Sequence, residues 1–273
     1  MKEVPGHIGL AGISLSAKGG DMLVEFSLLF ALCILFGLKE NNHSESLPAG
    51  RQGGKMKKAI FAIVGIALLL VTKVYAYDDG DFQIWNTDVE EFKVNKDSKI
   101  AFEEEFRWGN NSKEFYYQHY DVGFFYNLEK WLNIGGGYRH VYELKNGEFK
   151  LENEPYLTAS LLWDLKGFKF DDRSRIEYRH FDYQTDSWRY RNKITAKLPW
   201  KFTKLEIQPY LSDEIFIGFS TISELNQNGF SSGLSMNLTK NLKAEIYYLL
   251  QSTKSSGKWV DTNVLGTKLK IAF

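Results

Sequence analysis

Residues 259–273 read Trp259-Val-Asp-Thr-Asn-Val-Leu-Gly-Thr-Lys-Leu-Lys-Ile-Ala-Phe273. Apolar and polar side chains alternate along this stretch with a period of two, which is the pattern of a β-strand with one apolar face. Leu269, Ile271 and Phe273 lie on the apolar face, and Lys268 and Lys270 lie on the opposite one. Because the apolar face continues to the terminal Phe273, we expect this strand to be held in a sheet and not to fray into water.

The composition suits a sheet with a polar interior. The chain has 273 residues, formal net charge zero and 15% aromatic residues. A mean hydropathy of −0.33 is too polar for a bundle of membrane helices, whereas a membrane barrel has a polar lumen. The neutral charge indicates no nucleic acid partner. Cys33 is the only cysteine and precedes the predicted mature region, so we expect no disulfide there, and we expect neither a metal nor another cofactor.

Residues 56–76 have the pattern of a secretory signal peptide. Lys57 and Lys58 precede an apolar run over residues 59–71, and Val74 and Ala76 occupy the positions that a signal peptidase reads. The alternative is a membrane anchor, but the run is shorter than the ~20 residues of a spanning helix. We predict cleavage after Ala76, a mature barrel over residues 77–273, and an upstream, non-native start segment over residues 1–55. In the alternative reading, residues 22–38 form an anchor helix.

Alternating segments follow one another throughout the mature region, with no sustained helical period. The eleven segments are residues 82–94, 100–108, 116–128, 132–142, 155–165, 176–178, 188–198, 205–217, 230–238, 242–250 and 259–273. This pattern predicts an all-β fold, a transmembrane antiparallel β-barrel. Bacterial barrels have even strand numbers, so we predict twelve strands, or ten if residues 82–94 do not belong to the wall.

The connectors differ in kind. Tight turns are predicted at residues 127–130, 164–167, 199–204 and 239–241, and longer polar loops at residues 145–148, 182–187, 218–228 and 253–258. Bacterial barrels have short periplasmic turns and longer outer loops. We therefore expect the tight turns to face the periplasm.

Two resemblances sharpen this prediction. The terminal strand, with Leu269, Ile271 and Phe273, resembles the assembly signal of Gram-negative outer-membrane proteins. Residues 208–216, 242–251 and 263–266, with residues 82–85 and 103–107, resemble an outer-membrane β-barrel family that is catalogued only as a domain of unknown function. The resemblance implies a barrel and no activity. The resemblance of the terminal strand implies the barrel assembly machinery as a partner, and an outer-membrane barrel implies outer-membrane lipid.

Charged side chains gather on the faces predicted to line the lumen. A basic wall is expected from two neighbouring strands and consists of Arg173, Arg175, Arg179, Arg189, Arg191 and Lys193. The acidic lumen residues are predicted to be Glu103, Glu105, Glu206 and Glu214, and Glu152 and Glu154 gather on the fifth segment. In a narrow lumen these acids face the bases and form an ionic network. In a wider lumen the same walls orient permeating solutes.

Catalytic patterns are weak. His119 and Asp121 share one face of a strand, as a base and its orienting group would, but no serine stands out as a nucleophile. His140 and His180 lack the spacing of a metal site. The run Gly135-Gly136-Gly137 indicates a bend or bulge in a strand. We predict a bacterial outer-membrane barrel, either a narrow pore or a structural barrel with a charged lumen. The alternatives are an outer-membrane lipid hydrolase using His119 or His180, and a soluble periplasmic all-β binding protein.

Overall fold

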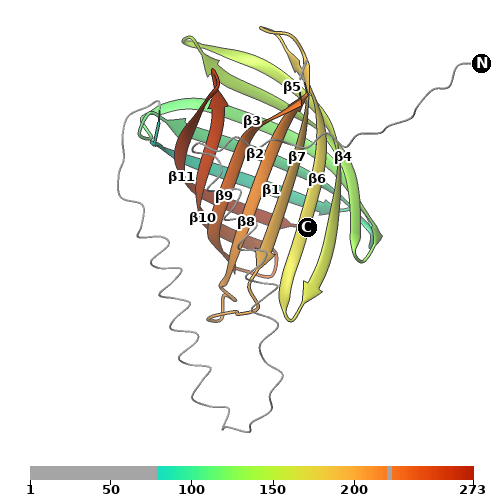
Figure 1. The fold of residues 1–273 in the computed structure, drawn as a ribbon. Helices are drawn as coiled ribbons and strands as arrows, with labels where there is room; N and C mark the ends of the chain where they lie inside the picture. Colours follow the sequence, from blue (N-terminus) through green and yellow to red (C-terminus); the bar gives the residue numbers. More distant parts are fainter. Residues whose placement is uncertain (1–78, 220–222) are drawn as a thin grey trace, which may run out of the picture. The chain divides into compact units, whose positions relative to one another are not determined.

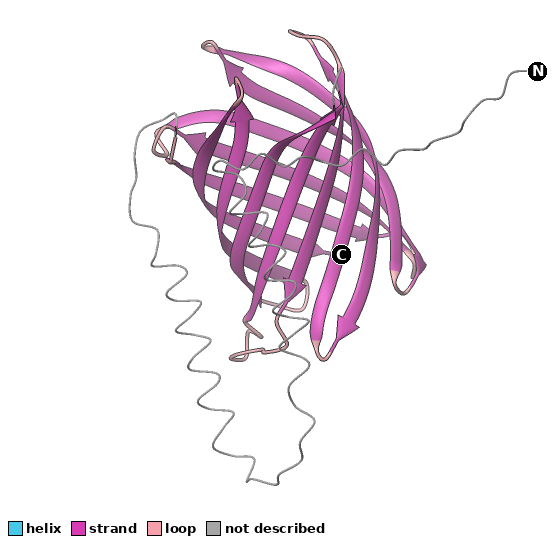
Figure 2. Cartoon of the chain, viewed as in Figure 1, coloured by secondary structure: helices cyan, strands magenta, loops and turns pink. Residues whose placement is uncertain are grey.

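Strands are the only regular elements in the residues that the computed structural model describes, which are 79–219 and 223–273 (Figure 2). The strands are β1 (Asp81–Lys93), β2 (Ser98–Gly109), β3 (Glu114–Glu129), β4 (Leu132–Lys145), β5 (Glu148–Leu165), β6 (Phe168–Phe181), β7 (Ser187–Lys197), β8 (Gln208–Phe219), β9 (Ser223–Asn237), β10 (Leu242–Ser255) and β11 (Lys258–Ala272). The described residues contain no helix of the length and apolarity needed to cross a membrane. The predicted signal peptide and residues 1–55 lie outside the described residues.

The eleven strands form one closed barrel (Figure 1). Each strand pairs antiparallel with the next in the sequence, and β1 pairs parallel with β11, from Asp81 beside Thr262 to Glu91 beside Ala272. The prediction of twelve strands is therefore wrong, and so is the alternative of ten, because β1 is a wall strand. In an up-and-down barrel with an odd number of strands, the first and last strands run in the same direction. The closing pair must then be parallel, and the backbone edge is still removed.

Every predicted segment falls in one of the strands, but the eighth begins later than expected. Phe202 and Ile207 form a small antiparallel bridge of their own within the β7–β8 connection, and β8 starts only at Gln208. The connections also differ from the prediction. The expected loops at residues 145–148 and 253–258 are two-residue turns with positive φ, at Asn146 and Gly147 and at Ser256 and Gly257. The predicted contrast between short turns at one end and longer loops at the other is wrong. The β7–β8 connection, where a tight turn was predicted at residues 199–204, is the longest connection between the described strands.

The distribution of side chains across the wall is the reverse of that in a soluble protein, with polar residues buried and apolar residues exposed. Among the described residues, sixteen polar or charged residues are buried and only ten hydrophobic ones. Meanwhile 27 large hydrophobic side chains are exposed, Leu157 the most at 68%. Not all of the outer face is apolar, because Asp88 and Glu104, which pair in register, point outward beside the β1–β11 seam, as does Glu90.

Inward-facing glycines accommodate aromatic rings that lie against the inner wall. A Cβ atom on Gly233 would lie 2.7 Å from the Tyr210 ring, and one on Gly266 would overlap the Tyr247 ring. Gly137 makes room in the same way for Tyr156. Of the predicted bend or bulge at residues 135–137, the bulge is absent, because β4 pairs in unbroken register with β3 and β5 there. These glycines instead keep bulky rings close to the wall, which leaves space in the lumen.

Candidate functional site in the barrel lumen

The lumen contains a cavity of about 1260 Å³. Lys130, in the β3–β4 turn, lines it at the end of the barrel where Phe273 lies, here termed the C-terminal end. Lys145 and Lys254, beside the β4–β5 and β10–β11 turns, line it at the opposite, N-terminal end. The cavity therefore reaches both ends of the barrel.

Positive charge exceeds negative charge around this cavity. Fourteen lysine and arginine side chains line it against nine aspartates and glutamates, although the whole chain is neutral. Arg175, Asp121 and Glu177 are buried but do not line the cavity, and including them reduces the excess only from five to four. An aqueous cavity with this excess attracts anions.

Ion pairs run around most of the inner wall as one continuous chain. Its links are Lys268–Glu103 at 2.9 Å, Glu103–Arg139 at 3.6 Å, Arg139–Glu154 at 3.8 Å, Glu154–Arg189 at 2.6 Å, Arg189–Glu177 at 2.5 Å, Glu177–Arg191 at 3.0 Å, Arg191–Glu214 at 2.8 Å and Glu214–Arg173 at 2.9 Å. This ionic belt involves β11, β2 and every strand from β4 to β8. The wall formed by β9 is different, since Gln227, Gly229 and Ser231 line the cavity there without charge.

The most buried part of the belt surrounds Glu177, which is 0% exposed. Both of its oxygens accept hydrogen bonds, one from Arg189 and one from Arg191. Arg175 lies beside it and over the Tyr156 ring, 3.9 Å from the ring centre, yet its Nε and one terminal nitrogen have no hydrogen-bond partner. That terminal nitrogen lies 3.8 Å from Glu177 and 3.9 Å from Asp121, so this buried guanidinium is paired only at the outer limit of ion-pair distance.

A second group of polar contacts lies on β1, β2 and β3. The Arg107 guanidinium is held between the rings of Trp85 and Tyr117, at 3.6 and 4.0 Å from their centres, and it pairs with Glu105. Arginine stacks well on aromatic faces, so this side chain is fixed in place. Thr87 also donates a hydrogen bond to Glu105, at 2.9 Å.

The predicted lumen residues fall into three groups. Those that line the cavity are Arg173, Arg179, Arg189, Arg191, Lys193, Glu103, Glu105 and Glu214. Arg175 is buried on the same face of β6 without lining it. Glu206 is a correction, because it lies in the β7–β8 connection, exposed, where a hydrogen bond from Lys201 lowers the pKa of its carboxyl. The alternating pattern had been extended through the Phe202–Ile207 bridge, where it does not apply.

The belt members Arg139 and Lys268 were not among the predicted residues. Arg139 on β4 pairs in register with Glu154, which was predicted among the acids of β5, and Lys268 reaches Glu103 from the terminal strand. Beside the belt, Asp121 accepts hydrogen bonds from Arg139 and from Tyr156, at 3.1 and 2.7 Å. Counting alternate residues along β4 would have found Arg139.

Within the described part of the chain, His119, His140 and His180 do not form a catalytic arrangement with a serine. Buried His119 contacts the Tyr117 hydroxyl and Glu103, at 3.1 and 3.3 Å, while Asp121 is engaged elsewhere. His180 contacts Asp186 in the β6–β7 loop. No group of three or more His, Cys, Asp or Glu side chains that could hold a metal ion occurs in the part of the chain that the structure describes.

Comparison with protein families gives one match. The model of the family described as "Protein of unknown function (DUF2490)" matches residues 82–262, from β1 into β11. The chain belongs to this family. No curated protein matches the chain. The resemblance to a family catalogued as a domain of unknown function and the expectation of a barrel are both confirmed, and the DUF2490 description assigns no activity.

Proposed function

We propose that residues 77–273 form an integral barrel of the outer membrane of a Gram-negative bacterium, with a narrow, positively charged pore. Residues 56–76 direct export as a signal peptide that is cleaved after Ala76. The lipid of the outer membrane surrounds the wall, and the barrel assembly machinery inserts it through the terminal strand. No enzymatic step is part of this proposal.

The observation that carries the proposal is the inverted distribution of side chains. Exposed apolar residues such as Leu157 and Ile246 face outward along the strands, while charged residues are buried inside. A soluble protein rarely exposes contiguous apolar surface of this extent. In a bilayer the same surface contacts hydrocarbon, and the closed barrel leaves no backbone edge without hydrogen bonds.

Aromatic side chains support two membrane interfaces. At the N-terminal end the ring contacts are Trp108–Phe115, Phe115–Phe149 and Tyr178–Trp188. At the C-terminal end they are Trp163–Phe170, Phe168–Trp200 and Phe92–Phe273. Belts of aromatic residues at both ends of an apolar band are typical of outer-membrane barrels. Trp85 belongs to neither group of rings, because it is buried in the lumen.

The terminal residue is built into the wall beside the seam. The Phe273 amide donates to the carbonyl of Glu91, and its ring stacks on Phe92 with 4.8 Å between centroids. Outward-facing Leu269 is exposed. These contacts support a role for Leu269, Ile271 and Phe273 in closing the barrel during assembly, and they support a periplasmic location for the C-terminal end.

The pore is proposed to run along the uncharged wall of β9. The ionic belt narrows the lumen from the other strands, while Gly229 and Ser231 take up little space. Lys169 and Lys197, which pair in register near the C-terminal end, line the cavity without belonging to the belt. They raise the local anion concentration at that mouth.

Conductance in a planar bilayer tests the pore. We expect a small conductance with a preference for anions. The double variant Lys169→Gln and Lys197→Gln should reduce that preference without lowering stability, because neither lysine belongs to the ionic belt. A correctly folded barrel with no conductance would contradict the pore and leave a structural barrel.

A soluble periplasmic all-β protein is the second candidate, and Asp88, Glu90 and Glu104 favour it. Carboxylates on a lipid-facing wall are unfavourable, although less so than Arg or Lys at the same depth. Cell fractionation separates the candidates. We expect the protein in the outer membrane after a high-salt wash, with different gel migration before and after boiling. Release by salt alone would support the soluble candidate.

A further inference from the structure

Three cations converge on one carboxylate in the C-terminal half of the lumen. One oxygen of Glu214 accepts hydrogen bonds from a terminal nitrogen of Arg173 at 2.9 Å and from two nitrogens of Arg191 at 2.8 and 3.1 Å. The Lys193 ammonium lies 3.7 Å from the other oxygen. Arg191 has a second counter-charge in Glu177, but within the described residues Glu214 is the only carboxylate at ion-pair distance from Arg173 or Lys193.

These cations retain unused hydrogen-bond donors. At 3.7 Å the Lys193 ammonium is beyond hydrogen-bond distance of Glu214, and its side chain is 36% exposed and lines the cavity, so its donors are open to a ligand. The Nε of Arg173 is buried and also lacks a hydrogen-bond partner. Glu214 therefore uses only part of the positive charge and of the hydrogen-bond donors of Arg173 and Lys193.

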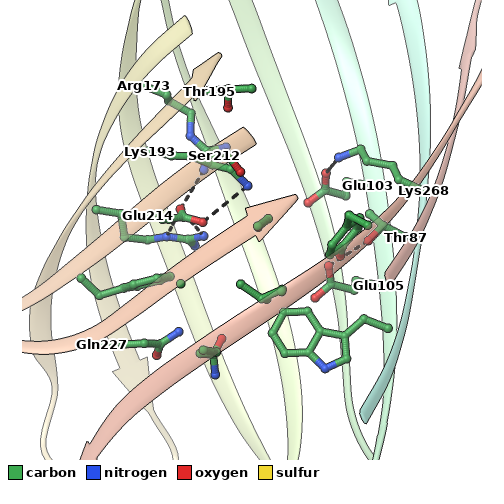
Figure 3. Close-up of a pocket in the computed structure, with 18 of the residues that line it drawn as sticks. Thr87, Glu103, Glu105, Arg173, Lys193, Thr195, Ser212, Glu214, Gln227 and Lys268 are labelled. Atoms are coloured by element: carbon green, nitrogen blue, oxygen red, sulfur yellow. Dashed lines mark hydrogen bonds and ion pairs between the residues drawn. The ribbon is translucent and has the colours of Figure 1, made fainter. Parts of the chain in front are cut away.

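The opposite wall adds a fourth cation. Figure 3 shows Lys268, paired with Glu103, across the cavity from Lys193 and Glu214. The hydroxyl-bearing side chains of Ser212 and Thr195 line the cavity beside Lys193 (Figure 3).

We propose that this cluster, formed by Arg173, Lys193, Arg191 and Lys268, is a binding site for a doubly charged phosphate group. The guanidinium of Arg173 and the ammonium of Lys193 supply charge-assisted donors, and phosphate oxygens are the acceptors that such groups bind best. Glu214 occupies the centre of the cations in the free protein and acts as an internal competitor. The ligand is either inorganic phosphate or the phosphate of a small organic monoester, since the cavity is large enough for both.

This inference goes beyond the proposed function and does not require the lumen to conduct. Binding can be measured on the purified, folded barrel in detergent. A barrel that binds phosphate without conducting would contradict only the pore. A barrel that conducts without binding phosphate would contradict only the site.

Calorimetric titration with inorganic phosphate, and separately with glycerol 3-phosphate, tests the site at constant ionic strength. We expect saturable binding, weakened at least about tenfold by Lys193→Gln and by Arg173→Gln, because each removes a charge-assisted donor. Glu214→Gln should strengthen binding by about tenfold or more, since the competing carboxylate is lost. Tighter binding of one titrant supports the site and identifies the source of the phosphate.

The matched control is Lys145→Gln, which removes a cavity-lining lysine at the opposite end that pairs with Glu143 at 2.9 Å. Its phosphate affinity should equal that of the unmodified protein. Equal weakening by Lys145→Gln and Lys193→Gln would overturn the proposal, because general attraction would then explain binding. Absence of saturable binding for both titrants would also overturn it. Should Glu214→Gln not fold, judged by its migration before and after boiling, the comparison of Lys193→Gln with Lys145→Gln decides.

Discussion

Replacing Glu177 by glutamine should destabilise the barrel by about 3–5 kcal/mol. The carboxylate is 0% exposed and accepts hydrogen bonds from Arg189 at 2.5 Å and from Arg191 at 3.0 Å. Glutamine keeps the shape but leaves these two guanidinium groups, and Arg175 at 3.8 Å, without their nearest shared counter-charge. Two charge-assisted hydrogen bonds at ~1.5–3 kcal/mol each agree with the ~3–5 kcal/mol cost of breaking a buried pair.

The assay is urea unfolding of the protein reconstituted in lipid vesicles, followed by tryptophan fluorescence. The matched control is Glu143→Gln, whose carboxylate pairs with Lys145 at 2.9 Å between side chains that are 31% and 39% exposed. Such a pair contributes at most about 1 kcal/mol. Similar losses for Glu177→Gln and Glu143→Gln would refute the reasoning, because the ionic belt would then be as hydrated as the surface.

Three further predictions concern the wall and one loop. Gly266→Ala should lower the free energy of unfolding by about 1–3 kcal/mol, because the added Cβ overlaps the Tyr247 ring. The loss should be smaller in a Tyr247→Ala background, and an unchanged loss in this double-mutant cycle would contradict the contact. Leu157→Arg should lower the free energy of unfolding by about 2–4 kcal/mol if the side chain faces lipid, and Leu157→Met should lower it by less than about 1.5 kcal/mol. Equal midpoints of the two variants in a urea titration would argue against a lipid-facing wall. Hydrogen bonds from His180, Tyr178 and the Phe181 amide lower the pKa of Asp186 from 3.8 to about 2. These bonds therefore stabilise the loop fully above pH 4, and their stabilisation is lost as the carboxylate is protonated towards pH 2. Hydrogen exchange at the Phe181 amide, corrected for its intrinsic rate, should therefore accelerate over that range and be fast throughout in Asp186→Asn; constant protection in the unmodified protein would contradict this.

The alternating pattern of the sequence was sufficient to predict the barrel wall, because alternation is a local property of each strand. It located segments in all eleven strands and placed Arg173, Arg191 and Glu214 on the inner face. The strand number could not be derived in the same way. It depends on how the first and last strands meet, and the expectation of twelve came from a rule about other barrels, whereas β1 and β11 here pair in parallel.

The alternating pattern could not predict which charged side chains form ion pairs with one another. Lys268 and Glu103 are 165 residues apart, and they meet because the barrel closes through β1 and its strands are inclined (Figure 1). Glu206 shows where the alternating pattern misleads. The pattern continues through the β7–β8 connection, which forms a small bridge of its own and is not part of the wall. The role of Gly137 depends on the Tyr156 ring of the neighbouring strand, so single-strand reasoning predicted a bend or bulge instead.

The central claim is that the wall separates lipid from a polar lumen, and two adjacent residues of β10 test it at one depth. Ile246 is 42% exposed on the outer face, and Glu245 lines the cavity. Single cysteines, Ile246→Cys or Glu245→Cys, in the mature barrel of residues 77–273, which has no other cysteine, would carry the same fluorophore in vesicles that contain a lipid-attached quencher. The account predicts strong quenching of the label at residue 246 and little at residue 245. Equal quenching at both positions, or none at either, would contradict a membrane-spanning wall.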